Sequence, residues 1–160
     1  MHRSRLQPAF ALCLALAAAG PAAAGGCAST ETAAALSERF APALNGERAR
    51  QGLAPLSLSP ALAGTAADHA CDMARRGAFS HKGRLGSSVR TRARRHGYRA
   101  CLIAENIAMG YPDAQTTLKG WMTSRGHRRN ILLHDVTEFG LGMAPAGGGT
   151  RWVLVLARRC

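Results

Sequence analysis

The sequence has 160 residues, 47% hydrophobic and 19% charged, which suits one globular domain with a sizeable core. Its formal net charge is +12, and almost all of its cations are arginines. Such a charge favours anionic partners, unless arginine simply replaces lysine throughout the source proteome. The sequence has no G-x-S-x-G, H-E-x-x-H, Walker or dinucleotide-binding motif, which excludes the enzyme classes built on them.

The N-terminus has the pattern of a secretory signal peptide over residues 1–24, with basic residues, an apolar run and a small-residue cleavage site. We therefore expect a secreted or periplasmic protein with an N-terminal lead-in at residues 25–35. An exported protein rarely meets nucleic acid, so we do not expect nucleic acid as a partner. Cys27 follows two glycines, as a lipidated cysteine does, but Ala24 stands where lipoproteins usually carry Leu. Lipid anchoring at Cys27 is the less favoured alternative. No later stretch is long and apolar enough for a transmembrane segment.

The rest of the chain alternates helical and strand patterns. Apolar residues recur at helical spacing, and glycines end the helices. The expected elements are a helix from Thr30 or Thr32 to about Gln51, a linker at 53–58, a helix at 60–76, a short basic helix at 89–96, a strand at 101–109, a helix at 113–122, and a hairpin of strands at 137–144 and 151–157. This order predicts an α+β fold in which helices cover a small sheet, mostly antiparallel.

Residues 120–133 combine a large aromatic residue, a polar segment and an apolar run. Trp121 and the run Ile131-Leu132 are expected to be buried. Between them, a turn at Gly126 would present His127 from the protein surface, which is a common way to build a site. The alternative is a solvated helix end whose arginines interact with the helix dipole.

Glu105 is the most informative single residue, because it interrupts the apolar strand 101–109. A buried carboxylate is costly unless a cation or hydrogen-bond donor pairs with it. Its partner is expected to be either an arginine, in a structural pair, or histidines that face a cleft. His69, His96 and His134 have no partner in view. The cations between residues 82 and 99 lack interleaved aromatics, so they are interpreted as a surface patch for anions or as merely solvated.

The chain has five cysteines, and Cys13 lies in the signal peptide. The remaining even number in an exported chain predicts two disulfides, for which three connectivities exist. Because chain ends are often close together, we favour Cys27–Cys160 and Cys71–Cys101. No pair has the C-x-x-C spacing of a metal site.

Several motifs together resemble those of the CAP superfamily, which groups cysteine-rich secretory, antigen 5 and pathogenesis-related type 1 proteins (SCP-like domains). The matching motifs are Leu44-Asn45 with Arg48, Phe79-Ser80-His81, Gly97-Tyr98, Ala104-Glu105-Asn106-Ile107-Ala108, Trp121-Met122, Ser124, Gly126-His127-Arg128, Asn130-Ile131-Leu132 and Gly140-Leu141-Gly142. The resemblance covers residues 36–160 and implies a three-layer α-β-α sandwich with a central cleft.

By motif, His81, Glu105 and His127 resemble the cleft residues of that family, and Ser124 and Asn130 are expected to be binding residues. The second glutamate of many eukaryotic members is missing, since Trp121 to Arg125 offers only Thr123 and Ser124. His81 and His127 would be the ligands of a divalent ion such as zinc, as the family sometimes shows, with Glu105 as a third ligand or an orienting group.

The resemblance and the charge together favour a secreted, monomeric binding module for an anionic lipid or cell-envelope polymer. The alternative is a metal-assisted hydrolase, a peptidase or a cell-wall-active enzyme, that uses His81, Glu105 and His127. A structural or signalling domain with a degenerate cleft is the third class.

Overall fold

The computed structural model describes Cys27 and residues 31–160. The expected signal peptide at 1–24 lies outside the described residues, as do residues 25, 26 and 28–30 of the lead-in. The elements in chain order are α1 (Ala33–Ala49), β1 (Ser57–Leu58), α2 (Pro60–Arg76), the 3-10 turn η1 (Arg84–Gly86), α3 (Val89–Arg95), β2 (Ala100–Met109), α4 (Ala114–Thr123), α5 (Arg125–Ile131), β3 (Glu138–Ala144) and β4 (Arg151–Arg159). Among the described residues, no helix is long and apolar enough to cross a membrane.

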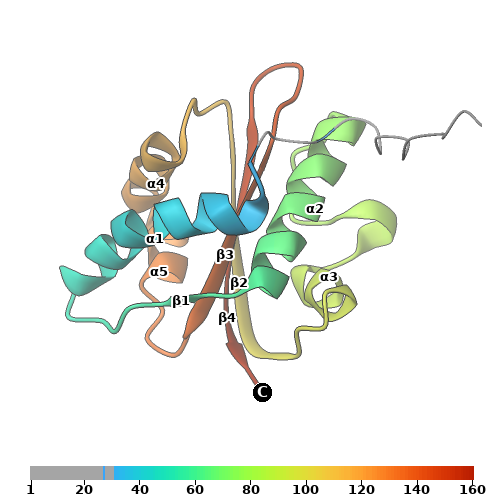
Figure 1. The fold of residues 1–160 in the computed structure, drawn as a ribbon. Coiled ribbons are helices and arrows are strands. Elements are labelled where there is room, and N and C mark those ends of the chain that lie inside the picture. Colours follow the sequence, from blue (N-terminus) through green and yellow to red (C-terminus); the bar gives the residue numbers. More distant parts are fainter. Residues whose placement is uncertain (1–26, 28–30) are drawn as a thin grey trace, which may run out of the picture.

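One four-stranded sheet, in the order β1-β3-β4-β2, forms the middle layer. The β1–β3 pair is parallel, and the β3–β4 and β4–β2 pairs are antiparallel. Figure 1 shows the sheet edge-on, with α2 and α3 on one side and α1, α4 and α5 on the other. The predicted α+β fold and three-layer α-β-α sandwich are therefore confirmed, with a mostly antiparallel sheet.

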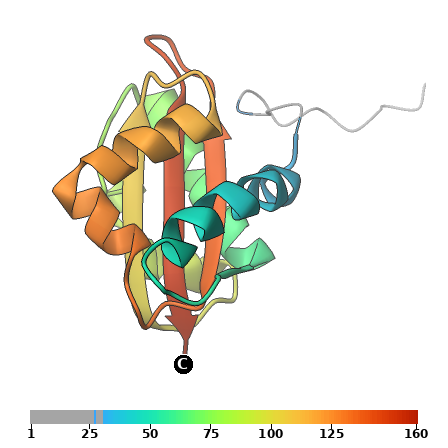
Figure 2. The same ribbon diagram turned by 90° about the vertical axis from the view of Figure 1, so that its left-hand side faces the viewer.

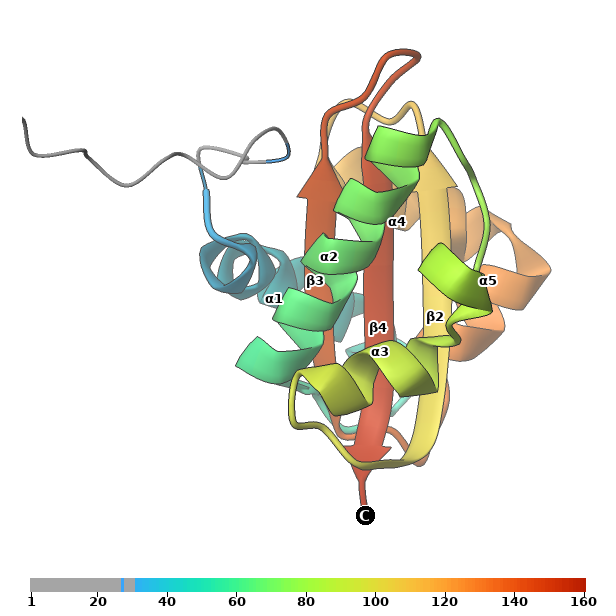
Figure 3. The same cartoon turned by 90° about the vertical axis from the view of Figure 1, so that its right-hand side faces the viewer.

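Strand β4 lies in the centre of the sheet, and both of its faces are buried from Arg151 to Ala157. Alternate residues supply two separate cores. Trp152, Leu154 and Leu156 join the cluster under α1, α4 and α5 (Figure 2), whereas Val153, Val155 and Ala157 join the cluster under α2 and α3 (Figure 3). The residues of one central strand thus hold both helical layers.

Helix α2 packs unusually close to β3, and two glycines make this possible. A Cβ atom added to Gly140 would lie 2.1 Å from the backbone nitrogen of Ala63, and one added to Gly142 would lie 2.2 Å from that of Ala67. Any side chain at either position would push the helix off the sheet. This close contact explains the spacing of the Gly140-Leu141-Gly142 motif.

Two local predictions were wrong. The predicted linker contains the two-residue strand β1, which is too short to produce a periodic pattern. The predicted turn at Gly126 is part of helix α5, because that glycine has ordinary helical geometry and the break between helices falls at Ser124, whose ψ is 119°. The predicted burial of Trp121 and Ile131 is confirmed, whereas Leu132 is only half-buried.

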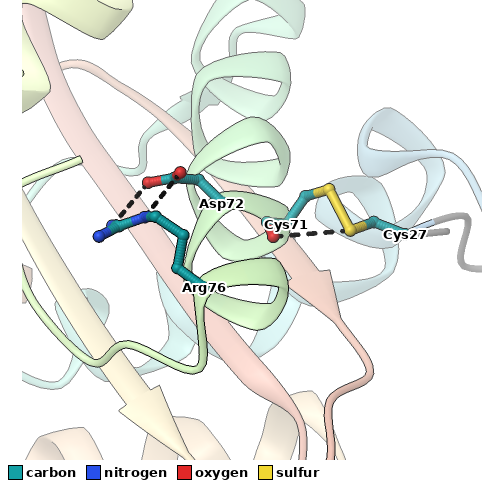
Figure 4. Close-up of a disulfide and its surroundings, with 4 residues drawn as sticks. All are labelled: Cys27, Cys71, Asp72 and Arg76. Atoms are coloured by element: carbon teal, nitrogen blue, oxygen red, sulfur yellow. Dashed lines mark hydrogen bonds and ion pairs between the residues drawn. A yellow bond between two sulfur atoms is a disulfide. The ribbon is translucent and has the colours of Figure 1, made fainter. Parts of the chain in front are cut away.

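The disulfides join Cys27 to Cys71 and Cys101 to Cys160, so the predicted pairs Cys27–Cys160 and Cys71–Cys101 are wrong. The sheet register explains this result. Residue 100 pairs with residue 159 across β2 and β4, which places Cys101 beside Cys160. Cys27 then lies against α2 (Figure 4). A sulfur in a disulfide cannot also carry a thioether-linked lipid, so this pairing and lipidation of Cys27 are mutually exclusive.

Candidate functional site

The candidate site is centred on β2, the edge strand of the sheet. Neighbouring side chains of a strand point to opposite faces. Glu105 pairs with Val155 and faces the layer of α2 and α3, while Asn106 pairs with Leu154 and faces the layer of α5. One edge strand therefore places a carboxylate on one face of the sheet and an amide on the other.

Glu105 is buried, with 3% of its side chain exposed, and both of its carboxylate oxygens have partners. Nδ1 of His81 donates to Oε1 at 2.9 Å, and Nη2 of Arg92 donates to Oε2 at 2.5 Å. The sequence led us to expect either histidines or an arginine as the partner of Glu105. In the structure, a histidine and an arginine both bind this carboxylate. This pairing offsets the cost of burying the charge.

His81 lies in the loop between α2 and α3, and 58% of its side chain is exposed. The hydrogen bond to Glu105 raises the pKa of His81 above its usual value, against a smaller opposing effect of burial. Because Nδ1 is bound to Glu105, Nε2 is the ring nitrogen left for a ligand. A cavity of about 240 Å³ lies beside it, lined by His81, Lys82, Ser88, Val89, Ile103, Ala104 and Glu105.

His69, for which the sequence suggested no partner, is completely buried on α2. Its Nε2 donates to the carbonyl oxygen of Ser80 at 2.9 Å and lies 3.9 Å from Oε1 of Glu105. Burial lowers the pKa of His69, which favours the neutral ring. His69 thus anchors the residue before His81. Its position in the buried stripe of α2, with Ala66 and Met73, was the sequence signal that could have revealed this role.

Arg92 was interpreted as part of a solvated basic patch, but only 7% of its side chain is exposed. Besides Glu105, its guanidinium donates to the carbonyl oxygens of Ser87 at 2.7 Å and His81 at 3.2 Å. These bonds attach the loop before α3 to the buried carboxylate. Along the sequence, Arg92 stands among several cations that are exposed, so its charge alone did not distinguish it.

His127 approaches β2 from the opposite face, on α5. Its backbone carbonyl accepts a hydrogen bond from Nδ2 of Asn106 at 3.0 Å. Burial lowers the pKa of His127, and repulsion by a protonated His81 lowers it further, so the two rings lie within electrostatic reach of each other. His81, Glu105 and His127 therefore lie around the same edge strand.

Ser124 and Asn130 have structural contacts. Ser124 is half-buried between α4 and α5, where its N–H donates to the carbonyl of Trp121. Nδ2 of Asn130 donates to Oδ1 of Asn106 at 2.9 Å and to the backbone carbonyl of Glu105 at 3.4 Å. These bonds hold α5 against the edge strand, on the face away from the Glu105 side chain.

The donor set does not match a zinc site with three protein ligands. Within residues 31–160 and Cys27, no group of three or more His, Cys, Asp or Glu side chains is placed to hold a metal ion. Glu105 is occupied by His81 and Arg92, so the two imidazoles of His81 and His127 are the remaining donors of the expected set.

Comparisons with known proteins agree with this geometry. The family model described as "Cysteine-rich secretory protein family" (CAP) matches residues 42–156. The chain is 34% identical over 103 residues to the protein YkwD of Bacillus subtilis, which covers 64% of this chain and 40% of that one. It is 33% identical over 96 residues to the membrane protein YlbC of the same organism, covering 60% and 28%. The chain thus spans less than half the length of these relatives.

Several solved structures resemble this one. An extracellular SCP-domain protein from Bacillus anthracis has a TM-score of 0.69 at 28% identity, covering 76% of this chain and 40% of that one. An outer surface protein from Borrelia burgdorferi has a TM-score of 0.71 at 16% identity, covering 85% and 99%, which is a likeness of fold alone. Because the family model covers most of the sequence, the chain belongs to the cysteine-rich secretory protein, or CAP, family.

Proposed function

We propose that this protein is an extracytoplasmic binding module whose His81 cleft holds an anionic or hydrogen-bond-accepting group of a cell-envelope lipid or polymer. The observation that carries this proposal is the full engagement of Glu105 by His81 and Arg92. A carboxylate with both oxygens bound is a poor free base, but it orients His81 so that Nε2 is directed away from it. The ring then acts as a fixed donor.

The cavity beside His81 supports binding of an amphipathic group. His81 and Lys82 provide donors at one side, and Val89, Ile103 and Ala104 provide an apolar wall. The raised pKa of His81 keeps the ring cationic to a higher pH than an isolated histidine, which favours an anionic ligand. A volume of about 240 Å³ suits one head group or one polymer unit rather than a whole molecule.

The proposed location outside the cytoplasm rests on three observations. The N-terminal sequence has the signal-peptide pattern, and the four cysteines Cys27, Cys71, Cys101 and Cys160 form two disulfides, which persist in oxidising compartments. The resembling structures are described as an extracellular protein and an outer surface protein.

The test is a sedimentation assay of the purified protein with phosphatidylglycerol vesicles and, separately, with isolated peptidoglycan. Wild-type protein is expected to sediment with one of these, and His81→Gln to lose most of that binding at pH 6. Lys119→Gln, an exposed charge change on α4, is the control and should bind as the wild type does. If His81→Gln and the wild type bind equally, the cleft is not the binding site.

The second candidate is a hydrolase, favoured by the 2.9 Å contact of His81 with a buried carboxylate, an arrangement that also suits a general acid or base. Within the described residues the expected set supplies only two imidazoles for a metal, which argues against the metal-assisted form. Calorimetry with zinc near neutral pH, together with peptidase and peptidoglycan-hydrolysis assays, tests this candidate. Measured heat and an activity lost in a His81→Ala/His127→Ala variant would favour it over binding.

A further inference from the structure

The layer of α2 and α3, which faces the viewer in Figure 3, contains a second cavity that is larger than the one at His81. Its volume is about 540 Å³, and three chain segments line it: α2, η1 and α3. The lining residues are Asp68, Cys71, Asp72, Arg75, Arg76, Arg84, Ser87, Arg92, Arg95 and His96. Five arginines thus face two aspartates, so the wall carries an excess of positive charge.

Both aspartates already have partners. Asp72 accepts two hydrogen bonds from Arg76, at 2.9 and 2.8 Å (Figure 4), and one from the backbone N–H of Arg84 at 3.1 Å. Asp68 lies 2.9 Å from Nε2 of His96. The two carboxylates are therefore engaged with other groups of the wall, and they leave the guanidinium groups of Arg84 and Arg95 uncompensated.

Three arginines keep unused donors. The side chains of Arg84 and Arg95 are exposed and form no ion pair or hydrogen bond within the described part of the chain. The Nε of Arg92 is buried and lacks a hydrogen-bond partner among the same residues, although its two terminal nitrogens are bound. A buried unpaired donor is costly, so the positive charge of this wall is not fully satisfied by the wall's own groups.

We propose that this cavity binds a phosphoryl group. Guanidinium groups donate in pairs to phosphate oxygens, and those of Arg84 and Arg95 come from two different segments of the wall. A tetrahedral anion accepts hydrogen bonds from several directions at once, which suits a wall of this kind better than a planar carboxylate would. The phosphoryl group lies among α2, η1 and α3, with the rest of its molecule directed to solvent.

Covalent and ionic links stabilise the wall of the phosphoryl site. Cys71 contributes to the lining, and its disulfide attaches Cys27 to the outer side of α2 (Figure 4). Arg92 belongs to this wall and also binds Glu105, which lines the His81 cleft, so one ion pair connects the two sites. The phosphoryl site does not depend on the proposed function of that cleft, because neither Arg84 nor Arg95 contacts His81 or Glu105.

Calorimetric titration with inorganic phosphate at pH 7 and low salt tests this site. An Arg84→Gln/Arg95→Gln variant is expected to bind phosphate about tenfold more weakly, since two charge-assisted donors are lost. Arg125→Gln/Arg129→Gln removes the same charge from exposed positions on α5 and is expected to change affinity by less than about twofold. Circular dichroism confirms that each variant is folded.

Two results would overturn the proposal: no phosphate binding by the wild type, or equal losses in both double variants, which would indicate diffuse attraction. His81→Gln separates this site from the cleft, because it is expected to leave phosphate binding unchanged whatever happens to the proposed function. Phosphatidylglycerol vesicles distinguish the source of the group. Vesicle binding that the Arg84/Arg95 variant loses and that phosphate displaces indicates a lipid head group, whereas phosphate binding without vesicle binding indicates a soluble or polymer phosphate.

Discussion

The two faces of the sheet differ in how their buried charged side chains are paired. On the face of α2 and α3, the buried network contains charged pairs, since Glu105 binds Arg92 and His81. On the face of α1, α4 and α5, the buried cation Arg48 binds backbone carbonyls instead. Arg48 of α1 donates to Ile131 at 2.8 Å and to Leu133 at 2.9 Å.

This difference suggests that one face has a structural role and that the other responds to pH and ligands. A guanidinium bound to carbonyls, as in Arg48, has no partner that titrates between pH 5 and 9, so the contacts of Arg48 do not change over that range. The ionic face contains the imidazoles of His69 and His81, whose charges respond to pH and to a ligand. Both candidate ligand sites lie on this ionic side or at its edge. We therefore interpret the face of α1, α4 and α5 as structural support for the face of α2 and α3.

The largest expected effect comes from breaking the ionic face. Glu105→Leu leaves the buried charge of Arg92 unpaired, so we expect the free energy of unfolding to fall by about 3–5 kcal/mol. Urea denaturation followed by circular dichroism measures it. The double variant Glu105→Leu/Arg92→Met removes both charges and is expected to lose less than the single variant. A double variant that is less stable than Glu105→Leu would contradict the ionic description.

The corresponding change on the other face is Arg48→Met, which leaves the carbonyls of residues 54, 131 and 133 without their donor. Because burying the guanidinium carries a desolvation cost that methionine lacks, we expect a smaller loss, about 2 kcal/mol. Urea denaturation at pH 5, 7 and 9 should give the same loss. A loss that varied with pH would show that a titrating group contributes to this contact.

A smaller effect is expected at Asn130, whose amide joins α5 to the edge strand. Asn130→Ala removes these bonds and leaves Oδ1 of Asn106 unpaired, which should cost about 1 kcal/mol. The exposed neighbour Arg129→Ala is the control, with a change within about 0.5 kcal/mol. Thermal melts of the three proteins measure the difference. Equal melting temperatures for Asn130→Ala and the wild type would show that this amide does not stabilise the fold.

The smallest effect concerns protonation. The hydrogen bond to Glu105 raises the pKa of His81, while burial and repulsion by His81 lower that of His127. The contribution of His81 to stability is therefore complete below pH about 6.5 and is lost as the pH rises through its folded pKa. NMR titration should show His81 releasing its proton at a higher pH than His127. In a His81→Gln variant the pKa of His127 should rise, and an unchanged value would contradict their proximity.

Much of the fold followed from the sequence pattern. The helices and the final hairpin had clear periodicity, and the motifs led us to expect His81, Glu105 and His127 in one cleft. What was missed depends on contacts between distant segments. His69 and Arg92 belong to the network because α2 and α3 pack on the same face as Glu105, which periodicity alone does not show.

The disulfides were missed for the same reason. Their pairing depends on the register of β2 against β4, and the general tendency of chain ends to lie close together pointed to a different pair. Helix α5 was missed because a glycine beside a histidine resembles a turn, although seven residues there adopt helical geometry.

The position of β4 constrains the order of folding. It is the last strand in the described chain but the central one in the sheet, between β2 and β3. Neither neighbour has its main partner until residues 151–159 have been synthesised, since β3 otherwise pairs only with two-residue β1 and β2 lies at the edge. Nascent chains shorter than this should therefore expose two hydrophobic faces together, which makes a holding chaperone more important for this topology than for one that adds its edge strands last.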